Sequence, residues 1–206
     1  MNSGERLPDD ILSDPDTALM IRFAAGDDSA FDRIVENFQR QVFGIIHRYI
    51  GDAASAEDCA QEVFIRIYKL KNTYRPTARL STLVYRITTN LCLNELRDRS
   101  RRRHVSLDEP SGPDEMPLAA SLADQSSPSA DAKIEGRERA RIVRTALAKI
   151  PDRQRIALVL HRFEGLSYAE IALALETNVD AVKALLSRAR QSLAEALQKD
   201  IEAGNI

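Results

Sequence analysis

A stretch without helical or strand periodicity, residues 105–132, divides this chain and limits what it can fold into. The segment (VSLDEPSGPDEMPLAASLADQSSPSADA) contains six acidic residues and no Lys or Arg. Few apolar side chains are available there to offset the entropy lost on ordering, so we predict a flexible acidic linker over 104–132. The 206-residue chain is therefore expected to form two modules, at 17–103 and 133–206, after an acidic amino-terminal extension at 1–16.

Both modules have the apolar spacing of α-helices, and neither has the alternating pattern of strands. The sequence predicts an all-α fold of two small helical domains joined by the flexible linker. The predicted helices cover residues 16–25, 28–50, 55–70, 80–103, 137–150, 151–163 and 167–175, with a last helix after Asn178.

Several helix ends can be predicted from the side chains beside them. Ser55 is expected to cap the third helix, and Ser167 with Glu170 forms a capping box for the seventh. Asn178 or Thr177 is expected to cap the last helix.

Composition and motifs exclude several kinds of function. No apolar run approaches the about 18 residues of a membrane span, and the acidic amino terminus lacks the apolar core of a secretory signal. The two cysteines, Cys59 and Cys92, and the three scattered histidines form no metal-ligand pattern. Because no phosphate loop, nucleophile elbow or HExxH motif is present either, we expect no catalytic residue, cofactor, metal or small-molecule substrate. The sequence indicates a cytoplasmic protein that is neither an enzyme nor inserted in a membrane.

Residues 166–190 (LSYAEIALALETNVDAVKALLSRAR) have the pattern of a helix-turn-helix. The second helix of such a motif enters the major groove, where its early exposed residues reach base edges. Val179 and Val182 are expected to face inward. The alternative is an ordinary solvated helix pair, which the short turn and the one-sided cations disfavour. The outward candidates are Asp180, Ala181, Lys183, Ala184, Ser187 and Arg188.

A basic cluster at residues 97–104 (RDRSRRRH) ends the predicted helix over 80–103. Cations are favourable at a helix carboxy terminus, so the cluster is also consistent with a plain solvated helix end. A nucleic-acid surface is favoured by other residues of that helix: basic side chains hold phosphates, and aromatic and amide side chains receive unstacked bases. The candidates are Tyr85, Arg86, Asn90, Arg97 and Arg101.

Taken together, four stretches resemble the extracytoplasmic-function (ECF) sigma factors of bacterial RNA polymerase. They are SAEDCAQEVFIRIYKL with STLVYRITTNLCLNELRDRSRR, then a variable linker, then IPDRQRIALVLHRFEGLSYAEIALAL with VDAVKALLSRARQSL. The resemblance covers most of the chain from Thr17 to Leu197 outside the linker. It implies sigma region 2 in the first module and sigma region 4 in the second.

The resemblance also implies roles for individual residues. Asp58, Gln61 and Glu62 match the face that docks on the clamp helices of the largest polymerase subunit, although periodicity alone allows Asp58 to be a capping partner of Ser55. Positions in the loop and in the helix after it match the pocket for a flipped base of the −10 element. The −10 residues are then Tyr74, Arg75, Tyr85, Arg86, Asn90, Arg97 and Arg101, and the −35 residues are His161, Ala181, Lys183, Ala184, Ser187 and Arg188.

The expected partners are core RNA polymerase, through its clamp helices and flap, and promoter DNA. The family also implies an anti-sigma factor, which could hold the protein at a membrane, and a linker that runs toward the RNA exit path.

This chain departs from the family pattern at Leu83, where Trp is frequent, and at Glu176, where Gly is frequent. Ala184 and Leu185 stand where Ser and Arg are usual, leaving fewer polar groups to read DNA.

Two other functions are consistent with parts of the pattern. The first is a stand-alone helix-turn-helix regulator that binds an operator as a dimer. Residues 133–206 carry thirteen cations against ten acids, a weak balance for that task. The second is a helical adaptor that binds polymerase without reading DNA, in which case the reading helix and the basic cluster would have no use.

Overall fold

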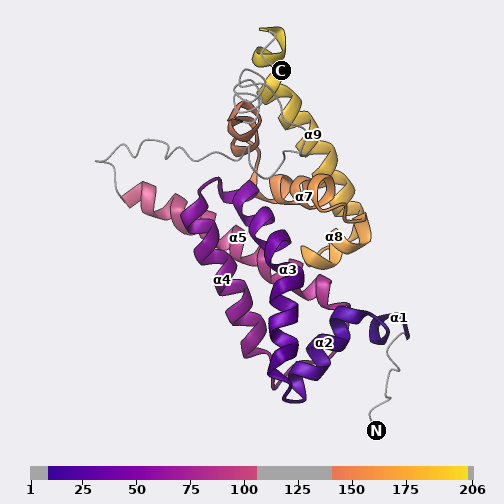
Figure 1. The fold of residues 1–206 in the computed structure, drawn as a ribbon. Helices are drawn as coiled ribbons and strands as arrows, with labels where there is room; N and C mark the ends of the chain where they lie inside the picture. Colours follow the sequence, from indigo (N-terminus) through magenta and orange to yellow (C-terminus); the bar gives the residue numbers. More distant parts are fainter. Residues whose placement is uncertain (1–8, 106–140, 204–206) are drawn as a thin grey trace, which may run out of the picture.

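The structure, a computed structural model, describes residues 9–105 and 141–203, with side chains described for 11–98, 141–198 and 200–203. Every regular element in this part of the chain is an α-helix, which confirms the predicted fold class (Figure 1). Most of the predicted linker lies outside the described residues. The helices are α1 (Asp9–Leu12), α2 (Pro15–Ala24), α3 (Asp28–Ile50), α4 (Ala53–Lys69), α5 (Leu80–Val105), α7 (Asp152–Phe163), α8 (Tyr168–Ala174) and α9 (Val179–Glu202), with a further helical segment at 141–148.

Helix α3 is the centre of the amino-terminal module, and α2, α4 and α5 pack around it (Figure 1). Its apolar side chains recur every three or four residues, so they form one inward stripe. The helix ends at Gly51, whose φ of 84° is in the left-handed region that glycine adopts without steric cost. The buried stripe consists of Ile34, Phe38, Val42, Ile45, Ile46 and Tyr49.

The predicted start of α4 was wrong by several residues. Asp52 is the N-cap, because its carboxylate accepts a hydrogen bond from the Ser55 backbone N–H over 3.0 Å. Ser55 itself lies inside the first turn. Both residues suit a cap, and the one that comes earlier in the chain takes the position, so that Ala53 and Ala54 join the helix.

Helices α7, α8 and α9 form the predicted helix-turn-helix module, together with residues 141–148. The capping box of Ser167 and Glu170 is present at the start of α8. Asn178 caps α9, since its Oδ1 accepts from the Ala181 N–H over 2.8 Å. Val182 is buried as predicted. Val179 is 38% exposed because it is the first residue of α9 and precedes the part of the helix whose inner face packs on α8.

The two modules pack directly on each other. Helix α7 lies against α3, and α8 lies against α5 (Figure 1). Ile46 and Tyr49 of α3 belong to the same apolar cluster as Ile156 and Leu160 of α7, so one core extends through both modules.

None of the helices in the described part of the chain is long and apolar enough to cross a membrane.

The turn before α9 generates a prediction about stability. Glu176 has a φ of 50°, a left-handed conformation that costs a residue with a Cβ roughly 1–2 kcal/mol. We expect Glu176→Gly to be more stable than Glu176→Ala by about 1 kcal/mol, because only glycine relieves this cost. Both variants remove the same carboxylate, so urea denaturation of the pair isolates the backbone effect; equal midpoints would contradict it.

Candidate nucleic-acid interface

The outward face of α4 carries the residues expected to dock on polymerase. Asp58 and Gln61 are exposed, and Glu62 is partly exposed. Arg66 Nε lies 2.8 Å from Glu62 Oε1, and this hydrogen bond holds the pKa of Glu62 below its usual value. The Glu62 carboxylate is therefore held by Arg66 in an i,i+4 ion pair on this face.

Two large apolar side chains are exposed on the same helix. Ile65 is 46% exposed and Tyr68 is 49% exposed. The Tyr68 ring packs at one side on Phe23 and Phe31, with centroid distances of 5.3 and 5.2 Å, which fixes its orientation. An acidic face bordered by fixed apolar side chains is suited to a protein partner.

The loop between α4 and α5 is held at both ends by α2 and α3. At its start, Lys71 Nζ contacts Asp28 Oδ1 at 2.5 Å and lies 4.7 Å from the Phe23 ring centroid. At its end, the buried Thr17 Oγ1 accepts from the Leu80 N–H over 2.9 Å. These contacts position the loop that carries two of the predicted −10 residues.

Those two loop residues differ in accessibility. Tyr74 is half-buried and packs on the core, and burial raises the pKa of its hydroxyl. Arg75 is exposed, and its Nη1 donates to the Tyr74 carbonyl over 3.0 Å. In this conformation Arg75 is available to a phosphate or a base, whereas only part of Tyr74 is.

Helix α5 carries the remaining −10 candidates. Asn90 and Arg97 are exposed, and the Arg101 side chain lies outside the described residues. Tyr85 is half-buried, and burial together with the Glu164 and Glu170 carboxylates raises its pKa to about 12. Both carboxylates belong to the other module.

Arg97 also borders a small hollow between α4 and α5. Its volume is about 320 Å³, and its lining carries charges of both signs. The lining residues are Cys59, Arg66, Leu91, Asn94, Glu95, Arg97 and Asp98. Cys92 is buried nearby; burial and, to a lesser degree, the neighbouring Cys59 raise the pKa of its thiol, which makes it an unreactive core residue.

The reading helix α9 presents its predicted face to solvent. Lys183, Ser187 and Arg188 are exposed, while Ala181 and Ala184 are partly buried. Lys183 Nζ lies 3.0 Å from Asp180 Oδ1, one turn earlier on the same surface. Lys183 is therefore paired within α9, and Arg188 is a second exposed cation available to a base edge or a phosphate.

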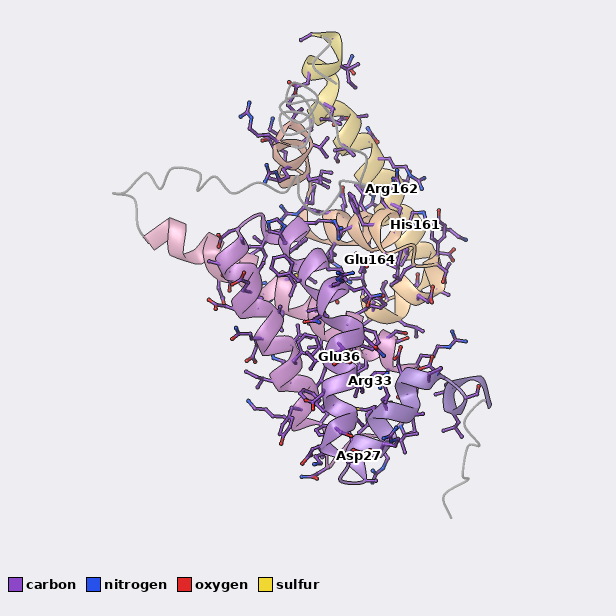
Figure 2. All side chains as sticks on the ribbon, in the orientation of Figure 1. Asp27, Arg33, Glu36, His161, Arg162 and Glu164 are labelled. Carbon is purple, nitrogen blue, oxygen red and sulfur yellow. The ribbon has the colours of Figure 1, made fainter. Side chains whose placement is uncertain are left out.

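His161 lies at the end of α7, beside α8 (Figure 2). Its Nδ1 is 3.0 Å from the Leu166 carbonyl, and since a carbonyl can only accept, Nδ1 carries the proton. Its ring packs edge-on against Tyr168, with the centroids 5.2 Å apart. The imidazole is thus oriented by the helix-turn-helix itself.

Sequence reasoning missed the residues that join the modules. Arg48 Nη1 lies 3.2 Å from Glu164 Oε1, and Thr89 Oγ1 donates to the Ala174 carbonyl over 3.1 Å. One signal was available in the sequence. Gly44 lies in the interior of α3, where glycine costs about 1 kcal/mol relative to alanine. A Cβ at Gly44 would lie 2.7 Å from Arg48 Nη1, so the glycine gives the guanidinium room to reach Glu164.

No group of three or more His, Cys, Asp or Glu side chains within the described residues could hold a metal ion. The described surface has instead two separate functional faces. One is acidic and apolar on α4, and the other is polar and basic on α9. Together they define a DNA-reading protein that also binds a protein partner.

Comparison with known families assigns both halves. Residues 34–102 match "Sigma-70 region 2", and residues 140–193 match "Sigma-70, region 4". The chain is 33% identical over 195 residues to the RNA polymerase sigma-H factor of Pseudomonas aeruginosa, covering 91% of this chain and 96% of that protein. It is 28% identical to the ECF RNA polymerase sigma-E factor of Escherichia coli over 89% of this chain and 94% of that protein.

The fold is also similar to solved structures. The structure of CnrH in complex with the cytosolic domain of CnrY matches with a TM-score of 0.64 at 21% identity, covering 89% of this chain and 97% of that chain. The sigma factor RpoE of Bartonella quintana, in complex with the anti-sigma factor NepR, matches with a TM-score of 0.62 at 20% identity, covering 82% and 96%. The chain belongs to the ECF sigma factors of RNA polymerase, which direct promoter-specific transcription initiation.

The anchoring of the loop by Thr17 can be tested. Thr17→Val keeps the side-chain shape but leaves the buried Leu80 N–H without its acceptor and also removes the hydrogen bond that the Thr17 hydroxyl donates to Asp14 Oδ2, so we expect a loss of about 1–3 kcal/mol in unfolding free energy. Thr145→Val is the matched control, since Thr145 is exposed and its hydroxyl bonds only within its own helix. Thermal unfolding of the two variants measures the difference, and similar losses would contradict the anchoring role.

Proposed function

We propose that the acidic face of α4 binds the clamp helices of core RNA polymerase, that the loop and α5 open and hold the −10 element, and that α9 reads the −35 element. The observation that carries this proposal is the accessibility of both faces on one chain: Asp58 and Gln61 on α4, and Ser187 and Arg188 on α9, are exposed. Neither face contributes a catalytic group, so the chemistry of RNA synthesis is left to polymerase.

The amino-terminal module supplies different groups for melted DNA. Arg75 and Asn90 are exposed and Tyr74 is half-buried, which suits an arginine for phosphate and an amide for a base edge. Because the loop is held at Lys71 and Leu80, these groups are positioned before DNA arrives.

The carboxy-terminal module has few polar groups with which to read duplex DNA. Lys183 and Arg188 suit guanine edges or phosphates, and Ala184 suits a thymine methyl group. Few phosphate contacts mean weak binding by this module alone. Polymerase compensates because it holds both modules over the same promoter and so raises their effective concentration, with the flap supporting region 4.

An anti-sigma factor is the proposed regulator. Both solved relatives described above are complexes, one with the cytosolic domain of CnrY and one with the anti-sigma factor NepR. Ile65 and Tyr68 give this chain an exposed apolar surface beside the polymerase-binding face. A partner that covers them would block polymerase binding. The proposed site of action is the cytoplasm, where polymerase and promoters are found.

Run-off transcription with core polymerase, with and without this protein, tests the proposal on genomic promoter fragments. We expect initiation only when both are present. Tight operator binding by the protein alone, without polymerase-dependent initiation, would instead favour a stand-alone helix-turn-helix regulator.

The −35 contact is tested by Arg188→Ala. If Arg188 reads a base, we expect promoter binding by the holoenzyme to weaken by about 1–3 kcal/mol at promoters that depend on their upstream element. Arg190→Ala is the matched control, because Arg190 is also exposed but projects from another side of α9. Filter binding measures both, and equal losses would indicate general electrostatics in place of base reading.

The polymerase contact is tested by Glu62→Lys. The change places a second positive charge beside Arg66, in place of the carboxylate that pairs with it. We expect about tenfold weaker binding to core polymerase. Glu36→Lys controls for net charge, because Glu36 is an exposed glutamate of α3 that pairs with Arg33 as Glu62 pairs with Arg66. Surface plasmon resonance with immobilised core gives the affinities, and unchanged binding by Glu62→Lys would refute the docking face.

A further inference from the structure

The first turn of α9, which follows α8 after a short connection, carries an exposed ion pair (Figure 1). Asp180 and Lys183 lie one turn apart, and Lys183 Nζ is 3.0 Å from Asp180 Oδ1. Residues three, four, seven and eight positions apart share one side of a helix, so Asp180 is on the same side as Lys183, Ala184, Ser187 and Arg188. The face proposed to read the −35 element therefore contains a carboxylate as well as cations.

The Asp180 carboxylate is not needed to cap the helix. That role belongs to Asn178, whose Oδ1 accepts from the Ala181 N–H over 2.8 Å. The side chains of Asp180 and Lys183 are 91% and 57% exposed, and an ion pair so accessible to water adds little to the stability of a fold. An acidic residue in the first turn also interacts favourably with the helix dipole, but that effect is independent of any DNA sequence. The pair is thus available to a ligand at little cost to the fold.

The pair has no net charge, which distinguishes it from a phosphate contact. Cations neutralise phosphates, and a carboxylate beside the DNA backbone opposes that attraction. Residues at the amino-terminal end of a reading helix reach base edges in the major groove. Some of those edges offer hydrogen-bond donors to a carboxylate, whereas phosphates offer none. The chemistry of Asp180 therefore suits a base edge and does not suit the backbone.

A G·C pair presents the groups that this ion pair requires. Its major-groove edge has two adjacent acceptors, N7 and O6 of guanine, and then one donor, N4 of cytosine. Lysine suits the guanine acceptors, aspartate suits the cytosine donor, and α9 holds the two side chains side by side. An A·T pair places its donor, N6 of adenine, between two acceptors and adds the thymine methyl group, so a carboxylate there also faces like partial charges.

We propose that Asp180 and Lys183 together read one G·C pair of the −35 element, with Asp180 accepting from N4 of cytosine and Lys183 donating to guanine. This inference rests on the proposed function and deepens it, because it assigns a base-pair preference to the first turn of α9. Asp180 orients Lys183 before DNA binds. Asp180 is therefore a residue that determines specificity, and it contributes more to discrimination between sequences than to affinity.

Asp180→Asn tests the base preference. An amide has nearly the shape of a carboxylate but both donates and accepts, and asparagine pairs in bidentate fashion with N6 and N7 of adenine. Reconstituted holoenzyme is bound to promoter duplexes randomised over the upstream element, and sequencing of the bound fraction gives the relative affinity for each base at each position. We expect the wild type to prefer G·C by about tenfold at one position, and Asp180→Asn to prefer A·T at that same position.

Two truncations separate base reading from simple repulsion. Asp180→Ala should abolish the preference at that position while overall promoter affinity stays the same or rises, because a carboxylate near DNA is removed. Lys183→Ala should weaken the preference at the same position and also lower the affinity. Uniform tightening for all sequences by Asp180→Ala would overturn the proposal, and so would effects of the two truncations at different positions.

Glu195→Gln is the matched control for loss of a carboxylate. Glu195 is exposed on the same helix, roughly 22 Å further along its axis. The control should leave the base preference unchanged at every position, and a shift as large as that of Asp180→Asn would contradict base reading by Asp180. Circular dichroism of all variants verifies that the helix content is retained.

The same selection separates this inference from the function on which it rests. If Arg188→Ala lowers promoter binding but Asp180→Asn leaves every base preference unchanged, the inference fails and the proposed function stands. If the wild-type holoenzyme has no base preference within the upstream element, the proposed role of α9 fails and this inference with it.

Discussion

The buried ion pair between Arg48 and Glu164 is the interaction on which the closed arrangement of the two modules depends. Burial raises the pKa of Glu164, and the Arg48 guanidinium partly offsets this shift. A buried pair of this kind adds little net stability, but it excludes arrangements that would leave either charge alone. It therefore fixes which face of α7 meets α3, and with it the position of α8 over α5.

Much of the favourable free energy of closure comes from apolar contact around that pair. Small helical modules bury a limited fraction of their surface, and a shared core increases it. Tyr49 is buried at the junction, with the Arg155 guanidinium 4.5 Å from its ring centroid. The contact between the modules therefore completes the core of the chain.

The parts of this structure that depend on local sequence could be predicted, and the junction could not. Apolar spacing identified the helices and the inward stripe of α3, and side-chain chemistry identified the capping box at Ser167 and the cap at Asn178. The cap of α4 and the burial of Val179 were wrong, because two polar residues competed for one cap and because a helix end can project beyond its partner.

Contacts between the modules join residues separated by 85 to 116 positions, and no periodicity encodes such a pairing. The resemblance to sigma factors assigned roles to Tyr85 and Arg86, but it carried no information about what lies against them in the free chain. Thr89 illustrates the difficulty. A threonine within a helix is unremarkable in sequence, and only its burial beneath α8 shows that its hydroxyl also serves the other module.

The charge of the chain is unevenly distributed, which bears on how a protein with a formal net charge of −2 can bind DNA. Summed over the molecule, the charge opposes binding to a polyanion, but only charges within about a Debye length of a site act strongly on it. Glu176 Oε1 lies 3.8 Å from Arg86 Nη1, and Glu164 Oε1 lies 3.2 Å from Arg48 Nη1, so carboxylates of the carboxy-terminal module lie beside cations of the amino-terminal module. The local potential at α5 therefore depends on the carboxylates that lie near it as well as on the net charge of the chain.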